Sequence, residues 1–322
     1  MPRKDYNISE IIQETYTVPV NTIFEESFTK PMYSYILPTM ISISLFINLI
    51  VLLILRNSRF NIVMYRFLQS KAFTKILICI FSMFSRDSHC DYCVANKYNT
   101  YLELIYRLYG KRMMIEVLIS TFSFIEIAIA YERLCLFRNT TSWIVQLGLK
   151  KNFLIAFMIA TSIQIPKVYA RTIKPITDHI YEIKLTDFGE SKYYNFYNFG
   201  HYTLLIIIIS GLYLTIIFKV IREYNKFLKN KSMRKTKKRR LTQMVISTAI
   251  LYMLVGILIC FTTLYMLIDR YVLMNTSDYN EITITVKLLL YLIFFFTWSL
   301  DSLTFFYFDK NANKLFKQLF MT

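Results

Sequence analysis

The chain has 322 residues, of which 55% are hydrophobic and 17% aromatic, and its formal net charge at pH 7 is +17. So much apolar surface excludes a single soluble globule of this size and favours the lipid bilayer as the solvent. A nucleic-acid binder is excluded as well, because the basic residues punctuate apolar runs instead of gathering on one soluble face. The six glycines and six prolines are scattered, so we expect one polytopic domain without linkers.

Residues 1–32 carry eight charged residues and no apolar run of the kind that a cleavable secretory signal contains. We expect this segment to be a short tail outside the membrane, with the first span acting as the membrane signal. Asn7 begins an Asn-X-Ser sequon in this tail.

Seven apolar stretches follow, each close to the roughly 20 residues that a helix needs to cross the hydrocarbon core. They lie at residues 33–55, 65–85, 113–137, 152–170, 201–222, 242–268 and 284–308. The second is the weakest, because Lys71 and Lys75 interrupt it. The sequence therefore predicts an all-α membrane protein, with a seven-transmembrane helix bundle over residues 33–308.

A cytoplasmic tail of residues 309–322 is expected after the seventh span. Within it, residues 310–320 predict a short amphipathic helix on the membrane surface, because their apolar side chains share one helical face. These are Leu315, Phe316, Leu319 and Phe320.

Lysine and arginine are distributed unequally between the two ends of the spans. The loops after spans one, three and five, with the C-terminal tail, hold 21 basic residues and three acidic ones, whereas the opposite side holds about 13 basic and 15 acidic residues. Cytoplasmic loops carry such a basic excess. We therefore expect a multi-pass plasma-membrane protein whose N-terminus is extracellular.

Two features lie on the outer side of this topology. Asn275 begins a second sequon, so Asn7 and Asn275 are the glycosylation candidates, with chance occurrence of either sequon as the alternative. Cys90 and Cys93 form a C-x-x-C in the first outer loop, and we favour a local disulfide there over free thiols. Zinc is not expected, because the sequence offers no two further ligands.

The third span ends in Tyr131-Glu132-Arg133. An arginine at the inner end of a helix, beside an acid that can pair with it, suits a switch in which the cation leaves its partner to receive a cytoplasmic protein. The alternative is a cation that only anchors the span at the interface. This tripeptide resembles the D/E-R-Y motif of the rhodopsin-like G-protein-coupled receptors, and Asn48 with Val51 is similar to their G-N-x-x-V pattern.

The resemblance covers residues 33–320 and rests on architecture more than on identical motifs. Asp301 stands in the Asn place of the family's N-P-x-x-Y motif. Tyr213 resembles the inner tyrosine of the fifth span that meets the switched arginine in active receptors, with a packing role as the alternative. The family's outer disulfide and its span-four tryptophan are missing, which makes the chain similar to divergent members of the invertebrate orphan or chemosensory type.

This resemblance implies a receptor that transduces an extracellular peptide or small-molecule signal to a heterotrimeric G protein. Besides the G protein, membrane lipids and an unknown extracellular ligand are the expected partners, and nucleic acid is not. The resemblance implies neither an enzymatic activity nor a cofactor.

Ionisable groups inside membrane spans are expensive, which makes them functional candidates. Lys75 falls where the resemblance puts the sodium-binding acid of the second span, and Glu126 and Asp301 face the same interior. We hypothesise that Lys75 pairs with Asp301, Glu126 or both, so that a fixed ammonium replaces a diffusible cation, and that Asn48 joins this polar network. The alternative is that Lys75 snorkels from a tilted or short span.

Polar residues nearer the outer ends of the spans would rim a cavity between the helices, where ligands commonly bind. Glu116 and Lys287 are the best candidates for charged ligand contacts, with a salt bridge that closes the mouth of the bundle as the alternative. The full set is Glu116, His201, Tyr202, Tyr265, Asp269, Lys287 and Tyr291.

A multi-span transporter or channel is the main rival function, because charged residues in spans also mark ion paths. Such a protein should show internal repeats or helices broken by Gly and Pro at matching places, and the sequence has neither. A membrane enzyme is less favoured, because the three histidines are not spaced for a metal on one helix face and no catalytic motif is present.

Overall fold

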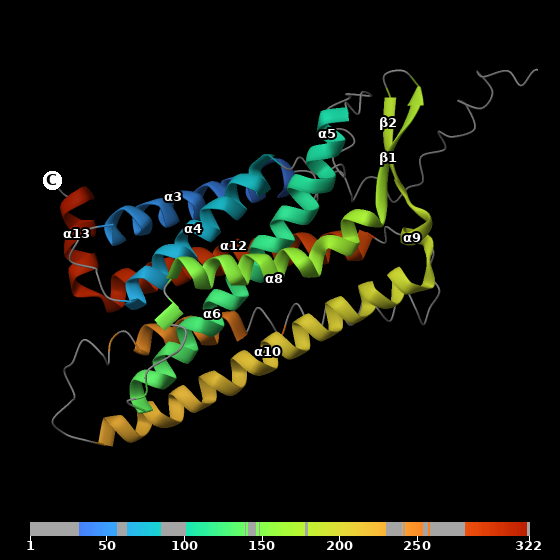
Figure 1. Cartoon of the computed structure of the whole chain (residues 1–322). Coiled ribbons are helices and arrows are strands. Elements are labelled where there is room, and N and C mark those ends of the chain that lie inside the picture. The colour runs from blue at the N-terminus through green and yellow to red at the C-terminus, as the bar shows by residue number, and fades with distance from the viewer. Residues whose placement is uncertain are drawn as a thin grey trace, which may run out of the picture.

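The computed structural model describes residues 32–56, 63–84, 101–138, 140, 146–147, 149–177, 180–229, 240, 242–253, 257 and 281–320. Over these residues nearly all regular structure is helical, and the rest is a two-stranded hairpin. The long helices form a bundle, with α13 across one end and the hairpin at the other (Figure 1). The expected helical character is confirmed. Of the expected tail 1–32, only Met32 belongs to the described residues.

The first apolar stretch begins with a π-helical turn, η1 (Met32–Ile36), and continues as α3 (Leu37–Leu55). Pro38 lies in the first turn of α3, directly after the π-helical turn. Helix α4 (Val63–Phe84) packs against α3. The Gln69 amide of α4 donates to the Leu55 carbonyl, which satisfies one of the acceptors that the end of α3 leaves open.

The third helical stretch is longer than the sequence indicated. It runs through α5 (Tyr101–Ile105), η3 (Tyr106–Met114) and α6 (Ile115–Arg138), whereas the apolar pattern predicted a start near residue 113. The added turns are polar, so a search for apolar residues could not find them. The Tyr106 hydroxyl donates to the Phe81 carbonyl of α4 (2.7 Å), and partial burial raises the pKa of this phenol above its ordinary value.

The fourth helix, α8 (Leu149–Tyr169), leads into a hairpin that the all-α expectation missed. Strand β1 (Arg171–Thr177) pairs antiparallel with β2 (Ile180–Leu185), and Ile173 lies opposite Ile183. The register shifts between Pro175 and Thr177, where a proline without an N–H group is tolerated. The expectation of an all-α chain is therefore wrong in this loop, because the short alternating strands carry a weaker signal than the apolar spans.

The second half of the chain contains a short helix, α9 (Asp187–Glu190), and the long helix α10 (Lys192–Lys229). The segment Thr242–Met253 is helical, and α12 (Glu281–Phe308) follows the gap in the description. Helix α13 (Lys310–Phe320) has the bounds that the amphipathic pattern predicted. Its Phe316 ring packs against Phe306 of α12, with 4.8 Å between ring centroids, so α13 is folded back onto the bundle.

Four helices of the described residues are long and apolar enough to cross a membrane: Leu37–Leu55, Leu108–Arg138, Lys150–Tyr169 and Leu289–Phe308. They correspond to the expected first, third, fourth and seventh spans. The segment Thr242–Met253 is a shorter apolar helix, and the remainder of the expected sixth span, apart from residue 257, lies outside the described residues. Four of the seven expected spans are thus supported by length and composition.

The apolar interior divides into two clusters along the bundle. We call the end of the bundle that carries α13 its inner end and the opposite end its outer end, as names of position in the fold. The inner cluster takes in Leu68 and Ala72 of α4 and Phe305 of α12, and it reaches α13. The outer cluster contains Ile78 of α4 and Trp298 of α12. Both clusters also include residues of α6, so α4, α6 and α12 each contribute to both clusters. Polar side chains lie between the two clusters, near the middle of the bundle.

Gly189 of α9 tests how closely α9 packs against α8. A Cβ atom at this position would lie 2.1 Å from the Ala170 carbonyl oxygen, a backbone atom. We therefore expect Gly189→Ala to lower the free energy of unfolding by about 1–3 kcal/mol, measured by thermal unfolding in detergent.

Gly211→Ala is the matched control, because a Cβ at this exposed position of α10 meets nothing within 4 Å. Alanine is the better helix former, so this variant should be unchanged or more stable by about 1 kcal/mol. Equal effects of the two substitutions would contradict the packing of α9 on α8.

Candidate functional site

Two lysines of α4 are buried in the middle of the bundle. Lys71 and Lys75 lie one helical turn apart and so share one face of α4, and their exposed fractions are 5% and 1%. The helix around them is apolar enough to pack against α3 and α6. An ammonium group in such surroundings is strongly destabilising unless an acid neutralises it. Each lysine therefore requires a partner from another helix.

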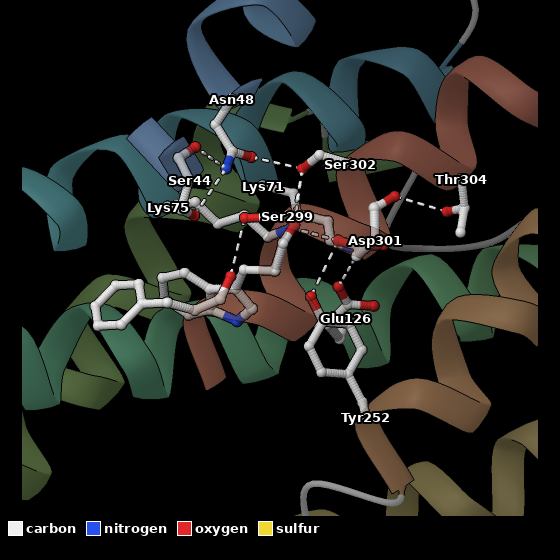
Figure 2. A network of polar contacts seen from close by, with 12 residues as sticks. Ser44, Asn48, Lys71, Lys75, Glu126, Tyr252, Ser299, Asp301, Ser302 and Thr304 are labelled. Atoms are coloured by element: carbon white, nitrogen blue, oxygen red, sulfur yellow. Dashed lines mark hydrogen bonds and ion pairs between the residues drawn. The ribbon is translucent and has the colours of Figure 1, made fainter. Parts of the chain in front are cut away.

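Two carboxylates from other helices supply that partner. Asp301 of α12 pairs with Lys75, and it also lies 2.9 and 3.0 Å from Lys71 Nζ through its Oδ2 and Oδ1 atoms. Glu126 of α6 pairs with Lys71. Figure 2 shows these four side chains, which we call the charge cluster. Their formal charges sum to zero, and their contacts join α4, α6 and α12.

Aromatic side chains enclose the charge cluster. The Tyr252 hydroxyl, from the segment Thr242–Met253, donates to Asp301 Oδ2 at 3.0 Å (Figure 2). Both lysine Nζ atoms lie 5.8 Å from the centroid of the Phe122 ring, and Lys75 Nζ lies 5.9 Å from that of Trp298. Ring faces at these distances attract cations. The aromatic shell thus keeps water out while still stabilising the two ammonium groups.

A chain of hydrogen bonds extends the site to α3. Lys75 Nζ lies 3.2 Å from the Trp298 carbonyl and 3.4 Å from Ser302 Oγ. The Ser302 hydroxyl donates to Asn48 Oδ1 (2.8 Å), and Asn48 Nδ2 donates to the Ser44 carbonyl (2.7 Å). The expected pairing of Lys75 with Asp301 is therefore present, and Asn48 belongs to the same polar network. Its functional role stays a prediction.

Lys71 is shared between the two acids of the charge cluster, because its Nζ atom contacts both Glu126 and Asp301. Both acids already face ammonium groups, which disfavours a further cation. Over the described residues, no group of three or more His, Cys, Asp or Glu side chains could hold a metal ion.

The inner end of α6 carries a second ionic contact. Arg133 is buried, and its Nε atom lies 3.0 Å from Glu132 Oε2. In the first turn of α4, the Tyr65 hydroxyl donates a hydrogen bond to Asp309. The other carboxylate oxygen of Asp309 accepts from two backbone N–H groups in the first turn of α13, at 2.9 and 3.2 Å. The Asp309 carboxylate thereby links the start of α4 to the start of α13.

Two further residues of the predicted switch pack against the same apolar cluster. Tyr131 is half-buried against the inner cluster, and Tyr213 of α10 also packs there. The expected contact of Tyr213 with Arg133 stays a prediction.

The predicted ligand residues are only partly described. Glu116 of α6 pairs with Lys167 of α8, a salt bridge near the outer end of the bundle. Tyr291 of α12 is exposed. His201 and Tyr202 lie in α10 and Lys287 lies in α12, but their side chains are outside the described part of the structure. Tyr265 and Asp269 lie outside the described residues altogether. The ligand pocket therefore stays a prediction, and so does the alternative salt bridge at the mouth of the bundle.

The remaining predicted sites fall outside the described residues. These are the sequons at Asn7 and Asn275 and the pair Cys90 and Cys93.

The sequence did not assign roles to Lys71, Tyr252 or Lys167. For Lys71 a signal was present, since it lies four residues before Lys75 and so shares its helix face. Tyr252 is one of 25 tyrosines, and Lys167 stands near the end of an expected span, so neither could be singled out.

The chain matches no protein-family model and no curated protein.

Lys71→Met tests the coupling within the charge cluster. Removing this ammonium leaves Glu126 without its cation in an apolar interior, so the free energy of unfolding should fall by about 3–5 kcal/mol. Adding Glu126→Gln removes the uncompensated charge and should restore a large part of the loss. Thermal unfolding of both single variants and the double variant provides the measurement. If the loss of stability in the double variant equals the sum of the losses in the two single variants, Lys71 and Glu126 are not energetically coupled.

Proposed function

We propose that the chain is a rhodopsin-like G-protein-coupled receptor with seven spans, an extracellular N-terminus and a cytoplasmic α13. In this proposal an extracellular peptide or small molecule binds among the outer ends of the helices. A heterotrimeric G protein binds at the inner ends, around Arg133. The plasma membrane is the proposed location, and its lipids surround the four apolar helices and the three further spans.

The observation that carries the proposal is the pair of ionic contacts on α6. Glu126 and Arg133 lie seven residues apart, which is two helical turns, so one rigid helix holds both the charge cluster and the inner pair. Both contacts are buried and both use side chains that other partners could take over. A change at the cluster can therefore be transmitted along α6 to the inner surface.

The charge cluster also supports a resting state. Asp301 holds α12 against α4, and the Tyr252 hydroxyl ties the segment Thr242–Met253 to the same carboxylate. Four helical segments therefore converge on one buried group of charges. In a receptor, a ligand that separates any of these segments would have to break contacts that are strong in a low-dielectric interior. The fixed ammonium of Lys75 would then do the work of a diffusible cation.

Arg133 is paired with Glu132 and buried, as expected of an inner surface that has not received a G protein. Release of Arg133 would provide a planar, permanently charged donor for carbonyl groups of the partner. The basic inner loops of the proposed topology would attract the acidic surface of that partner.

The proposal predicts that Arg133→Ala abolishes G-protein activation while the chain still folds. The reconstituted chain should accelerate nucleotide exchange on at least one purified Gα class, and the Arg133→Ala variant should not. Arg138→Ala is the matched control, because Arg138 lies on the same helix but is exposed, and its removal should leave exchange nearly unchanged. Equal activity of the wild-type chain and the Arg133→Ala variant would exclude the proposed switch.

A further inference from the structure

An exposed apolar patch lies where α8 ends and the hairpin begins. Tyr169 closes α8 and is 70% exposed, and Tyr193 in the first turn of α10 is 83% exposed. Between them in the sequence lie Leu185, at the end of β2, and Phe188 of α9, with exposed fractions of 42% and 41%. Exposed apolar side chains that gather in this way mark a surface that contacts a membrane or a partner.

Hydrogen bonds fix this patch at the height of the last turn of α8. The Thr186 hydroxyl donates to the Tyr169 carbonyl (2.7 Å), and the Thr186 backbone N–H donates to the Ala170 carbonyl (3.0 Å). The Gly189 N–H in turn donates to the Thr186 hydroxyl (3.1 Å), which caps α9. Residues 185–189 are thus attached to the carboxyl end of α8 and cannot lie far above it.

The length of α8 sets where that height falls in a bilayer. The apolar part of this helix, Lys150–Tyr169, has 20 residues, which span about 30 Å at 1.5 Å per residue. This is about the thickness of the hydrocarbon core. If Lys150 lies at one boundary of that core, Tyr169 lies at the other, in the layer where tyrosine side chains are enriched.

The patch continues a lipid-facing stripe of α8. Leu154, Met158, Ile165 and Tyr169 are exposed and recur at spacings of four, seven and four residues, which places them on one face of the helix. Of the four candidate spans, α8 has the smallest share of buried residues in the described structure. The stripe ends at Tyr169, whose carbonyl accepts the hydrogen bond from Thr186 that attaches residues 185–189 to α8.

We infer that residues 185–193, together with Tyr169, are an interfacial anchor. It inserts Leu185 and Phe188 into the lipid bilayer at the level where the headgroups meet the acyl chains. The tyrosines suit this place because their rings are apolar and their hydroxyls reach the headgroup layer. Exposed side chains of both signs, Lys184, Asp187 and Glu190, flank the apolar side chains, so zwitterionic headgroups suit the anchor. This inference rests on α8 crossing the membrane and holds whether or not the chain is a receptor.

The anchor would hold the hairpin against the membrane surface. In Figure 1 the hairpin extends across the end of the bundle, at a steep angle to α8. With α9 fixed in the headgroup layer, β1 and β2 would lie along that layer. The bilayer would thus orient the hairpin that connects α8 with α10.

Fluorescence quenching in reconstituted membranes tests this placement. Phe188→Trp adds an indole in place of another aromatic ring, and the full-length variant is placed in phosphatidylcholine vesicles that contain lipid with a nitroxide at the top of the acyl chain. Subtracting the emission of the wild-type chain gives the emission of the added tryptophan. The nitroxide lipid should quench this emission, and aqueous iodide should have little effect on it. Leu185→Trp provides a second reporter should the first variant not fold.

Two control positions calibrate the measurement. Met158→Trp, in the middle of the α8 stripe, should be quenched most by a nitroxide deep in the acyl chain. Lys174→Trp, exposed on β1, should be quenched by iodide more than the reporters are. If the reporters behave like Lys174→Trp, the patch faces water or a soluble partner and the inference is overturned. If Met158→Trp is not quenched by lipid, the stripe is not lipid-facing and the inference is overturned as well.

Discussion

Two ammonium groups on one face of α4 impose the constraint on which the rest of this structure depends. Neither Lys71 nor Lys75 can reach water from its buried position, so each must meet a carboxylate. Because α4 supplies no acid of its own, the partners come from α6 and α12, and these helices must approach α4 closely at one level. The apolar clusters on either side then pack around the charge cluster, whose position is set by the need to neutralise the two ammonium groups.

The same constraint accounts for the division of the interior along the bundle axis. The outer cluster is aromatic near the charges, with Phe122 and Trp298 against the lysines, and the inner cluster continues to α13. Glu126 belongs to the helix that ends in Glu132 and Arg133, so a helix held at its middle by one ion pair presents another at its inner end. Contacts of this kind have few intermediate arrangements, which supports the proposal of a receptor that alternates between two states.

Much of this arrangement could be predicted from the sequence, because membrane helices are bounded by the length of their apolar runs. The bounds of α13 followed from periodicity. The pairing of Lys75 with Asp301 followed from the cost of buried charge together with the resemblance to rhodopsin-like receptors, which indicated the two positions. The polar extension Tyr101–Met114 and the hairpin could not be predicted in this way, since neither is apolar enough to stand out. The contribution of Lys71 was accessible from its spacing, whereas the Tyr252 contact depends on how helices distant in sequence meet.

A charge exchange between α4 and α12 tests the central claim most directly. In a chain with both Lys75→Asp and Asp301→Lys, the four positions still sum to zero and positions 75 and 301 still carry opposite charges, whereas Lys71 then faces an ammonium group at position 301. Each single substitution leaves two excess like charges in the interior. The account predicts that the double variant yields more monodisperse protein after detergent extraction than either single variant. A double variant no better than the worse single one would contradict the claim that mutual neutralisation positions these helices.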